Sequence, residues 1–143
     1  MDKKTAVYIC TDCGIGDALD IEQLKEQGTA DFGIDVIKDH PFLCGQEGVG
    51  LIKQDIEGEG VNTVIIAACS HRVNYDAFNF GPGVIVQRVN LREQVVWSHA
   101  PNEEDTQMLA EDNLRMGCAQ AKDTELVQPY KAEEPYSKDI LVV

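Results

Sequence analysis

Four short apolar runs alternate along the chain with segments of helical spacing, and this alternation constrains the fold more than any other feature. Each run is rich in β-branched or aromatic side chains, as buried strands are. The runs are residues 5–10, 33–38, 62–69 and 84–89. The segments between them are long enough for the right-handed crossovers that join parallel strands. The sequence therefore predicts an α/β fold, with about four parallel strands and helices on both faces of the sheet.

The expected helices end at glycines or turns. They cover about residues 21–26, 46–57, 74–78, 91–99 and 101–121. Gly28 would end the first helix, and Gly58 and Gly60 would close the second, because glycine is favoured just past a helix C-terminus. By analogy with Rossmann and flavodoxin-like domains, we expect the strand order 2-1-3-4 in a single domain. This order places the topological switch point between strands 1 and 3.

Composition indicates a cytoplasmic protein with one core. The chain has 143 residues, of which 43% are hydrophobic. No apolar run approaches the roughly 20 residues that a membrane-spanning helix needs, and residues 1–4 do not resemble a secretory signal. The net charge of −13 argues against binding to nucleic acid or to an anionic membrane surface, because both would repel the chain.

The C-terminal part of the sequence differs from the rest. Residues 123–138 are polar and contain Pro129 and Pro135, which predicts a linker. Residues 139–143 begin a new apolar run, and a lone strand cannot form a domain. We expect a folded domain over residues 1–122, then the linker, and then the first strand of a truncated second domain, unless that strand pairs with the main sheet.

Four cysteines follow the first three predicted strands. Cys10 ends the first run and Cys13 follows it, Cys44 follows the second run after a short turn, and Cys69 ends the third. The carboxyl ends of parallel strands meet at one edge of a sheet, where open α/β sheets bind ligands. We therefore expect the four thiols to converge there. Converging soft thiolates suit an iron–sulfur cluster or zinc.

Other interpretations of the cysteines stay open. A C-x₂-C pair such as Cys10 and Cys13 also occurs in dithiol redox sites and as half of a zinc site. Buried cysteines are in addition common as small hydrophobic residues. Cys118 lies on the last predicted helix at core-like spacing, and we interpret it as a packing residue.

Five further residues are candidate contacts of a bound cofactor. Gly14 and Gly45 adjoin cysteines and would let backbone amides approach a cluster, although turn and helix-cap chemistry explains them equally well. Arg72 and Arg92 would offset the charge of an anionic cluster, and His71 could replace a thiolate or couple electron transfer to a proton. The alternative for all three side chains is a solvated loop charge.

Several short segments form a specific set when taken together. They are residues 10–16 (CTDCGIG), 43–48 (LCGQEG), 67–72 (AACSHR) and 89–94 (VNLREQ), with a weaker match at 114–116 (LRM). Over about residues 5–121, the chain resembles the N-terminal domain of the proteins that are similar to the A subunit of heterodisulfide reductase. Within that family it most resembles the B subunit of the quinone-interacting membrane-bound oxidoreductase of sulfate-reducing anaerobes.

The resemblance implies a function and a ligand set. Cys10, Cys13, Cys44 and Cys69 would hold one [4Fe–4S] cluster, and the domain would transfer electrons without substrate chemistry of its own. A flavin-binding domain would follow, with FAD bound there and not in this chain. The partners would be other subunits of a multi-subunit oxidoreductase. Two alternatives are a redox- or pH-responsive regulatory module and a module with a structural zinc site.

Overall fold

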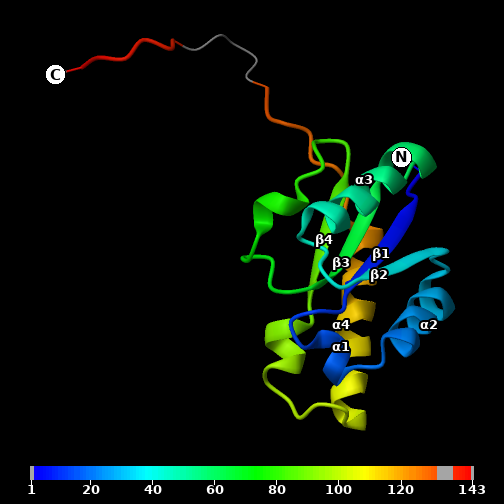
Figure 1. Cartoon of the computed structure of the whole chain (residues 1–143). Coiled ribbons are helices and arrows are strands. Elements are labelled where there is room, and N and C mark those ends of the chain that lie inside the picture. The colour runs from blue at the N-terminus through cyan, green and yellow to red at the C-terminus, as the bar shows by residue number, and fades with distance from the viewer. Residues whose placement is uncertain (1, 132–136, 143) are drawn as a thin grey trace.

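A sheet of four parallel strands forms the centre of the molecule (Figure 1). The structure is a computed structural model that describes residues 2–131 and 137–142. The strands are β1 (Thr5–Cys10), β2 (Val36–His40), β3 (Thr63–Ala68) and β4 (Ile85–Asn90). Their order is β2-β1-β3-β4, which confirms the predicted order. The carboxyl ends of β1 and β3 are therefore neighbours at the switch point.

Helices cover both faces of the sheet, which confirms the predicted fold class (Figure 1). They are α1 (Ile15–Ala18), α2 (Ile21–Phe32), α3 (Gln46–Glu59) and α4 (Glu104–Asp123), with short helical turns η1 (Tyr75–Phe78) and η2 (Arg92–Val96). Helices α2 and α4 pack against each other and against the sheet. Helix α3 lies on the opposite face, where Asp55 meets the side chain of Tyr8.

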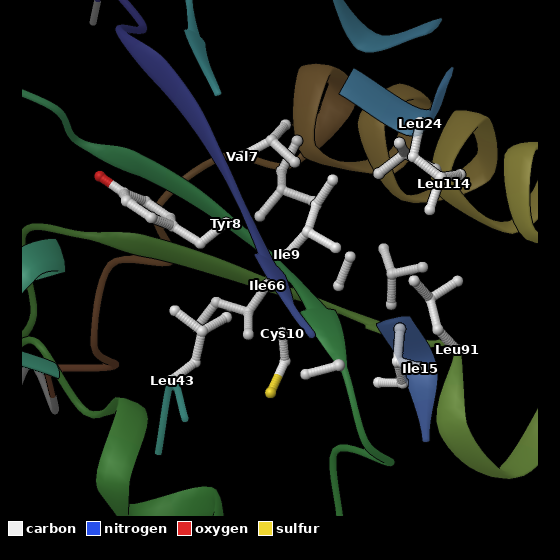
Figure 2. Packing of buried hydrophobic residues seen from close by; sticks show 14 of the residues in the cluster. Val7, Tyr8, Ile9, Cys10, Ile15, Leu24, Leu43, Ile66, Leu91 and Leu114 are labelled. Carbon is white, nitrogen blue, oxygen red and sulfur yellow. The ribbon is translucent and has the colours of Figure 1, made fainter. Parts of the chain in front are cut away.

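The core is built around β1 and β3, because these strands have a neighbour on each side and helices on both faces. All six residues of β3 are buried, and so are residues 6–10 of β1. Figure 2 shows Val7 on the same side of β1 as Leu24 and Leu114, with Tyr8 and Leu43 on the other side. Near-continuous apolar runs are therefore required in both strands, which is why the sequence identifies them clearly.

The predicted boundary between α2 and β2 is wrong. Gly28 does not end the helix, which continues to Phe32. A Cβ atom at Gly28 would lie 2.9 Å from Ile37 Cδ1, so glycine is needed there for close packing of the helix against β2. Gly33, with φ +61°, takes the left-handed conformation that follows the helix end. The strand therefore begins at Val36 rather than at residue 33.

The remaining helix ends agree in part with the expectation. Gly60 caps α3 in the left-handed conformation, as predicted, whereas Gly58 lies inside the helix. The expected helix over 91–99 is a π-helix over Arg92–Val96. The short helix α1 was not predicted from the sequence.

The described C-terminal residues lie outside the sheet (Figure 1). Residues 124–131 and 137–142 form neither helix nor strand, and Ile140, Leu141 and Val142 are 86–88% exposed. Residues 139–142 thus do not pair with the main sheet. The rest of the predicted linker, residues 132–136 with Pro135, and Val143 lie outside the described residues. Within the described chain, no helix combines the length and apolar character needed to cross a bilayer.

Candidate metal centre

Four cysteines line one cavity of about 230 Å³ at the carboxyl edge of the sheet. Cys10 ends β1, Cys13 lies in the loop that follows, Cys44 precedes α3, and Cys69 directly follows β3. Figure 2 shows the Cys10 sulfur pointing toward the side of the strand where Leu43 lies. All four thiols are free rather than joined in disulfides. The fold thus brings these cysteines together, while their role as metal ligands stays a prediction.

The loop from Cys10 to α1 reverses the chain in very few residues. Cys13 and Gly14 both have left-handed backbones, with φ of 56° and 85°. The Asp12 carboxylate accepts a hydrogen bond from the Cys13 amide at 2.7 Å, which stabilises the turn. A non-glycine residue with positive φ is strained, and such strain gathers at functional sites. Gly14 is the N-cap of α1 and is not among the described residues that line the cavity, so its conformation is explained by the turn itself.

The loop that carries Cys44 packs tightly onto the first turn of α3. A Cβ atom at Gly48 would lie 2.5 Å from both Leu43 Cα and the Phe42 carbonyl oxygen. A Cβ atom at Gly45 would overlap the Phe42 ring. Because these two glycines lack a Cβ atom, the loop can pack closely against the helix. This packing holds Cys44 where it lines the cavity.

Cys69 is held by an arginine that the sequence patterns did not reveal. Arg88 Nη2 donates to Cys69 O at 3.1 Å, to Cys69 Sγ at 3.2 Å and to Ser70 O at 3.1 Å. The guanidinium also lies over the Phe78 ring, 4.6 Å from its centroid. Burial lowers the pKa of Arg88, and the neighbouring Cys69 thiol acts in the opposite direction. The signal in the sequence was an arginine within the fourth predicted strand, since arginine is rarely buried without a partner.

Arg92 is the predicted cofactor contact that does line the cavity. It donates to Glu93 Oε1 at 2.8 Å and lies 4.7 Å from the centroid of the Trp97 ring. Burial alone would lower the pKa of Arg92, but Glu93 and the Cys13 thiol outweigh burial and raise it. Glu93 in turn accepts a hydrogen bond from the Ser70 amide at 2.8 Å, which ties the loop after β3 to η2.

The other predicted contacts follow cysteines closely in sequence but are not among the described residues that line the cavity. His71 and Arg72 are exposed, and both line a separate cavity of about 400 Å³ beside β4. Among the described residues, the wall of the cysteine cavity includes neither of them, nor Gly45. Cys118 lies on α4, is 3% exposed and packs in the core, and burial raises its pKa to about 11.

A single zinc ion and an iron–sulfur cluster require different spacings of their thiolate donors. Four thiolates on one zinc ion would stand roughly 4 Å apart, as tetrahedral bonds of about 2.3 Å require. Within the described residues, no group of three or more Cys, His, Asp or Glu side chains is arranged to hold one metal ion. The four cysteines line one cavity, and a cluster would place a body of iron and sulfide between its thiolates.

A buried polar atom without a hydrogen-bond partner is also relevant to whether the site fits a cluster. Arg88 Nε is buried without a hydrogen-bond partner. Within the described chain, Arg88 forms no ion pair, because no carboxylate oxygen lies within 4.0 Å of its guanidinium nitrogens. A partly buried cation needs a nearby anion. Metal-bound cysteines are thiolates and would supply that anion. The donor set, the cavity and this cation therefore fit a thiolate-bound cluster.

The chain has relatives among curated proteins. No protein-family model matches it. It is 32% identical over 141 aligned positions to the A subunit of the H(2):CoB-CoM heterodisulfide,ferredoxin reductase of Methanothermobacter thermautotrophicus, covering 93% of this chain and 21% of that protein. It is 32% identical over 129 positions to a protein of Archaeoglobus profundus that is named as similar to the heterodisulfide reductase A subunit, covering 85% of this chain and 18% of that protein.

A third relative is named for its cofactor. It is one of the iron-sulfur A subunits of the CoB--CoM heterodisulfide reductase of Methanopyrus kandleri, and it is 27% identical over 141 positions, covering 92% of this chain and 21% of that protein. The chain spans about a fifth of the length of the curated relatives that it matches. Over most of its own length, the chain is therefore homologous to one segment of the A subunits of heterodisulfide reductases.

Proposed function

We propose that this chain is an electron-transfer module that binds one [4Fe–4S] cluster in the cavity lined by Cys10, Cys13, Cys44 and Cys69. The observation that carries the proposal is the meeting of four thiols, from three separate strand ends, around one cavity. Similarity to subunits of heterodisulfide reductases, one of them named an iron-sulfur subunit, supports it independently. A bound cluster would supply one-electron transfer.

The residues around the cysteines have distinct roles in this proposal. Ile15, Leu43 and Phe78 form an apolar wall, which limits the access of water to the thiolates. Cys13 is exposed whereas Cys10 and Cys69 are each 8% exposed, so electrons would enter or leave on the Cys13 side. Phe42 lines the cavity, and Trp97 stacks against Arg92, which also lines it. These two rings are 53% and 64% exposed, which suits contact with a partner protein.

The wider context follows from the length of the relatives. We propose that the cluster domain, residues 1–122, is joined through residues 123–138 to a flavin-binding domain that begins with the apolar run 139–143. The parent protein would bind FAD there and would assemble with other subunits of an oxidoreductase, as the resemblance to the B subunit of the quinone-interacting membrane-bound oxidoreductase implies. In this arrangement the cluster domain relays electrons and carries out no substrate chemistry.

Metal analysis tests the proposal directly. The chain is purified or reconstituted without oxygen, and its iron, sulfide and zinc are measured beside its absorption spectrum. We expect about four iron and four sulfide per chain and absorption near 400 nm, as thiolate-bound iron gives. Stoichiometric zinc without iron would support the structural zinc alternative. A folded chain that takes up neither metal would overturn the proposal.

A pair of cysteine variants then tests the ligand set. Cys69→Ser should lose the cluster, because Cys69 lines the cavity. Cys118→Ser is the matched control, since Cys118 is equally buried but lies on α4 in the core. The control should retain its iron. Equal iron content in the two variants would contradict the assignment of Cys69.

A further inference from the structure

Arg88 is placed behind the cysteine cavity by the register of the sheet. Arg88 on β4 pairs with Ile66 on β3, and Ile66 pairs with Tyr8 on β1. Paired residues on parallel strands share a face, and so do residues two apart in one strand. Arg88 therefore lies on the face that also carries Cys10. From there a single Nη2 atom reaches the carbonyl and the sulfur of Cys69, so it fixes both the backbone and the side chain of this residue.

Three arginines lie near this edge, and their charges are compensated differently. Arg92 has Glu93 as an ion-pair partner at 2.8 Å. Arg72 is exposed, where water and salt screen its charge. Arg88 is partly buried, and within the described part of the chain it has no carboxylate in ion-pair contact. The anionic groups that act on its charge would be the cysteine thiolates, Cys69 most strongly and then Cys44, followed by the Glu93 carboxylate.

We infer that Arg88 is a positioning residue for Cys69 and the uncompensated positive charge that raises the reduction potential of a cluster bound by the four cysteines. The inference rests on the proposed function. Reduction adds one negative charge to an already anionic group. A fixed cation in partly dry surroundings stabilises the reduced form more than the oxidised form, because Coulomb energy grows with the charge and with a lower dielectric constant. The electron comes from the reductant used to set the potential, and no bond is made or broken.

The test compares Arg88→Gln and Arg88→Lys with Arg72→Gln as the matched control. Iron and sulfide are measured first, and the potential of each loaded protein is then measured by anaerobic titration with redox mediators. For Arg88→Gln we expect the ratio of reduced to oxidised cluster at a given potential to fall about tenfold, which corresponds to about 59 mV for one electron. Arg72→Gln should change this ratio less than twofold, roughly, because its exposed charge is screened.

Arg88→Lys separates charge from geometry. Lysine keeps the positive charge but lacks the planar fork, so the potential should stay near that of the wild type. Its cluster should be lost faster to a chelator, because Cys69 is no longer held by three contacts. If Arg88→Gln binds no cluster, restoration of cluster and potential by Arg88→Lys supports the inference, and failure of restoration overturns it.

The outcomes distinguish this inference from the proposed function. A wild-type chain without iron and sulfide would overturn both. A loaded wild type with equal potentials in Arg88→Gln and Arg72→Gln would overturn the role of Arg88 alone and leave the cluster assignment intact.

Discussion

Two groups of buried polar side chains lie on the same face of the sheet. They differ in how many of their polar atoms have a hydrogen-bond partner. In the first, Asp55 on α3 is 3% exposed and both of its carboxylate oxygens have a partner. Tyr8 Oη donates to Oδ2 at 2.8 Å, and Lys38 Nζ donates to Oδ1 at 2.7 Å. Burial and the neighbouring Asp55 raise the pKa of Tyr8 above its ordinary value, so the phenol stays a donor. The network is closed, and it joins β1, β2 and α3.

The cysteine cavity is the opposite case. Cys10 Sγ donates a hydrogen bond to the Pro41 carbonyl at 3.6 Å, but Arg88 keeps one buried nitrogen unpaired. The backbone around the cavity is also unusual, because both Cys13 and Asn74 have positive φ. Proteins hold such strain and unused bonding capacity mainly where a ligand compensates for them. The comparison indicates that the Asp55 network serves the fold, and it supports the proposal that the cysteine cavity holds a bound group.

The largest effect on stability should come from Asp55→Ala. This change leaves the Tyr8 hydroxyl buried without its acceptor and removes the partner of Lys38, so the free energy of unfolding should fall by about 3 kcal/mol. Urea unfolding of the metal-free protein measures it. Glu57→Ala, at an exposed position of the same helix, is the control and should change stability by less than about 0.5 kcal/mol. Iron loss from folded Asp55→Ala would contradict the separation of the two groups.

Gly48→Ala should have the next largest effect and should act on both stability and the site. The new methyl group would meet backbone atoms of Phe42 and Leu43, which cannot move without shifting the loop that carries Cys44. We expect a loss of about 2 kcal/mol in the free energy of unfolding and a reduced iron content. Gly50→Ala is a sharp control, because nothing lies within 4 Å of its Cβ position on the same helix. That variant should gain about 0.5 kcal/mol and keep its iron.

Tyr8→Phe should cost less than either change. It removes one hydrogen bond but leaves Asp55 paired with Lys38, so we expect a loss of about 1 kcal/mol by urea unfolding. Tyr75→Phe is the matched control, since Tyr75 is 75% exposed, and it should be neutral. A neutral Tyr8→Phe would show that the network contributes little to the fold.

The sequence predicted the sheet better than it predicted the surroundings of the cysteines. Analogy with flavodoxin-like folds predicted the strand order correctly. Strands β1 and β3 are apolar on both faces, so their identification was secure. Gly28 was misinterpreted because a glycine that ends a helix and one that admits a neighbouring strand look alike in a sequence. The close approach of Ile37 becomes visible only in three dimensions.

The strand topology predicted which cysteines lie close together, but it did not predict which charged side chains contact them. His71 and Arg72 follow Cys69 directly, and yet the loop turns them toward a separate cavity. Arg88 lies 19 positions from Cys69. The register of β3 and β4 pairs Arg88 with Ile66, three residues before Cys69, and from there the long side chain reaches the carbonyl and the sulfur of Cys69. Neighbours in sequence were therefore a poor guide to neighbours of the site, since side-chain direction depends on loop geometry and strand register.

Cys44→Ser should have the smallest effect on the free energy of unfolding and a large effect on cluster binding. Cys44 is only half buried, and within the described residues its sulfur makes no hydrogen bond, so Cys44→Ser should change the free energy of unfolding of the metal-free protein by less than about 0.5 kcal/mol. The same variant should fail to hold a complete cluster. Cys118→Ser should show the reverse, because it puts a hydroxyl among apolar neighbours at a cost of about 1–2 kcal/mol without touching the cavity. Urea unfolding and iron analysis of both variants measure the contrast. If Cys44→Ser destabilises the metal-free chain as much as Cys118→Ser does and keeps its iron, then Cys44 is a packing residue and the cavity has lost one of its four donors.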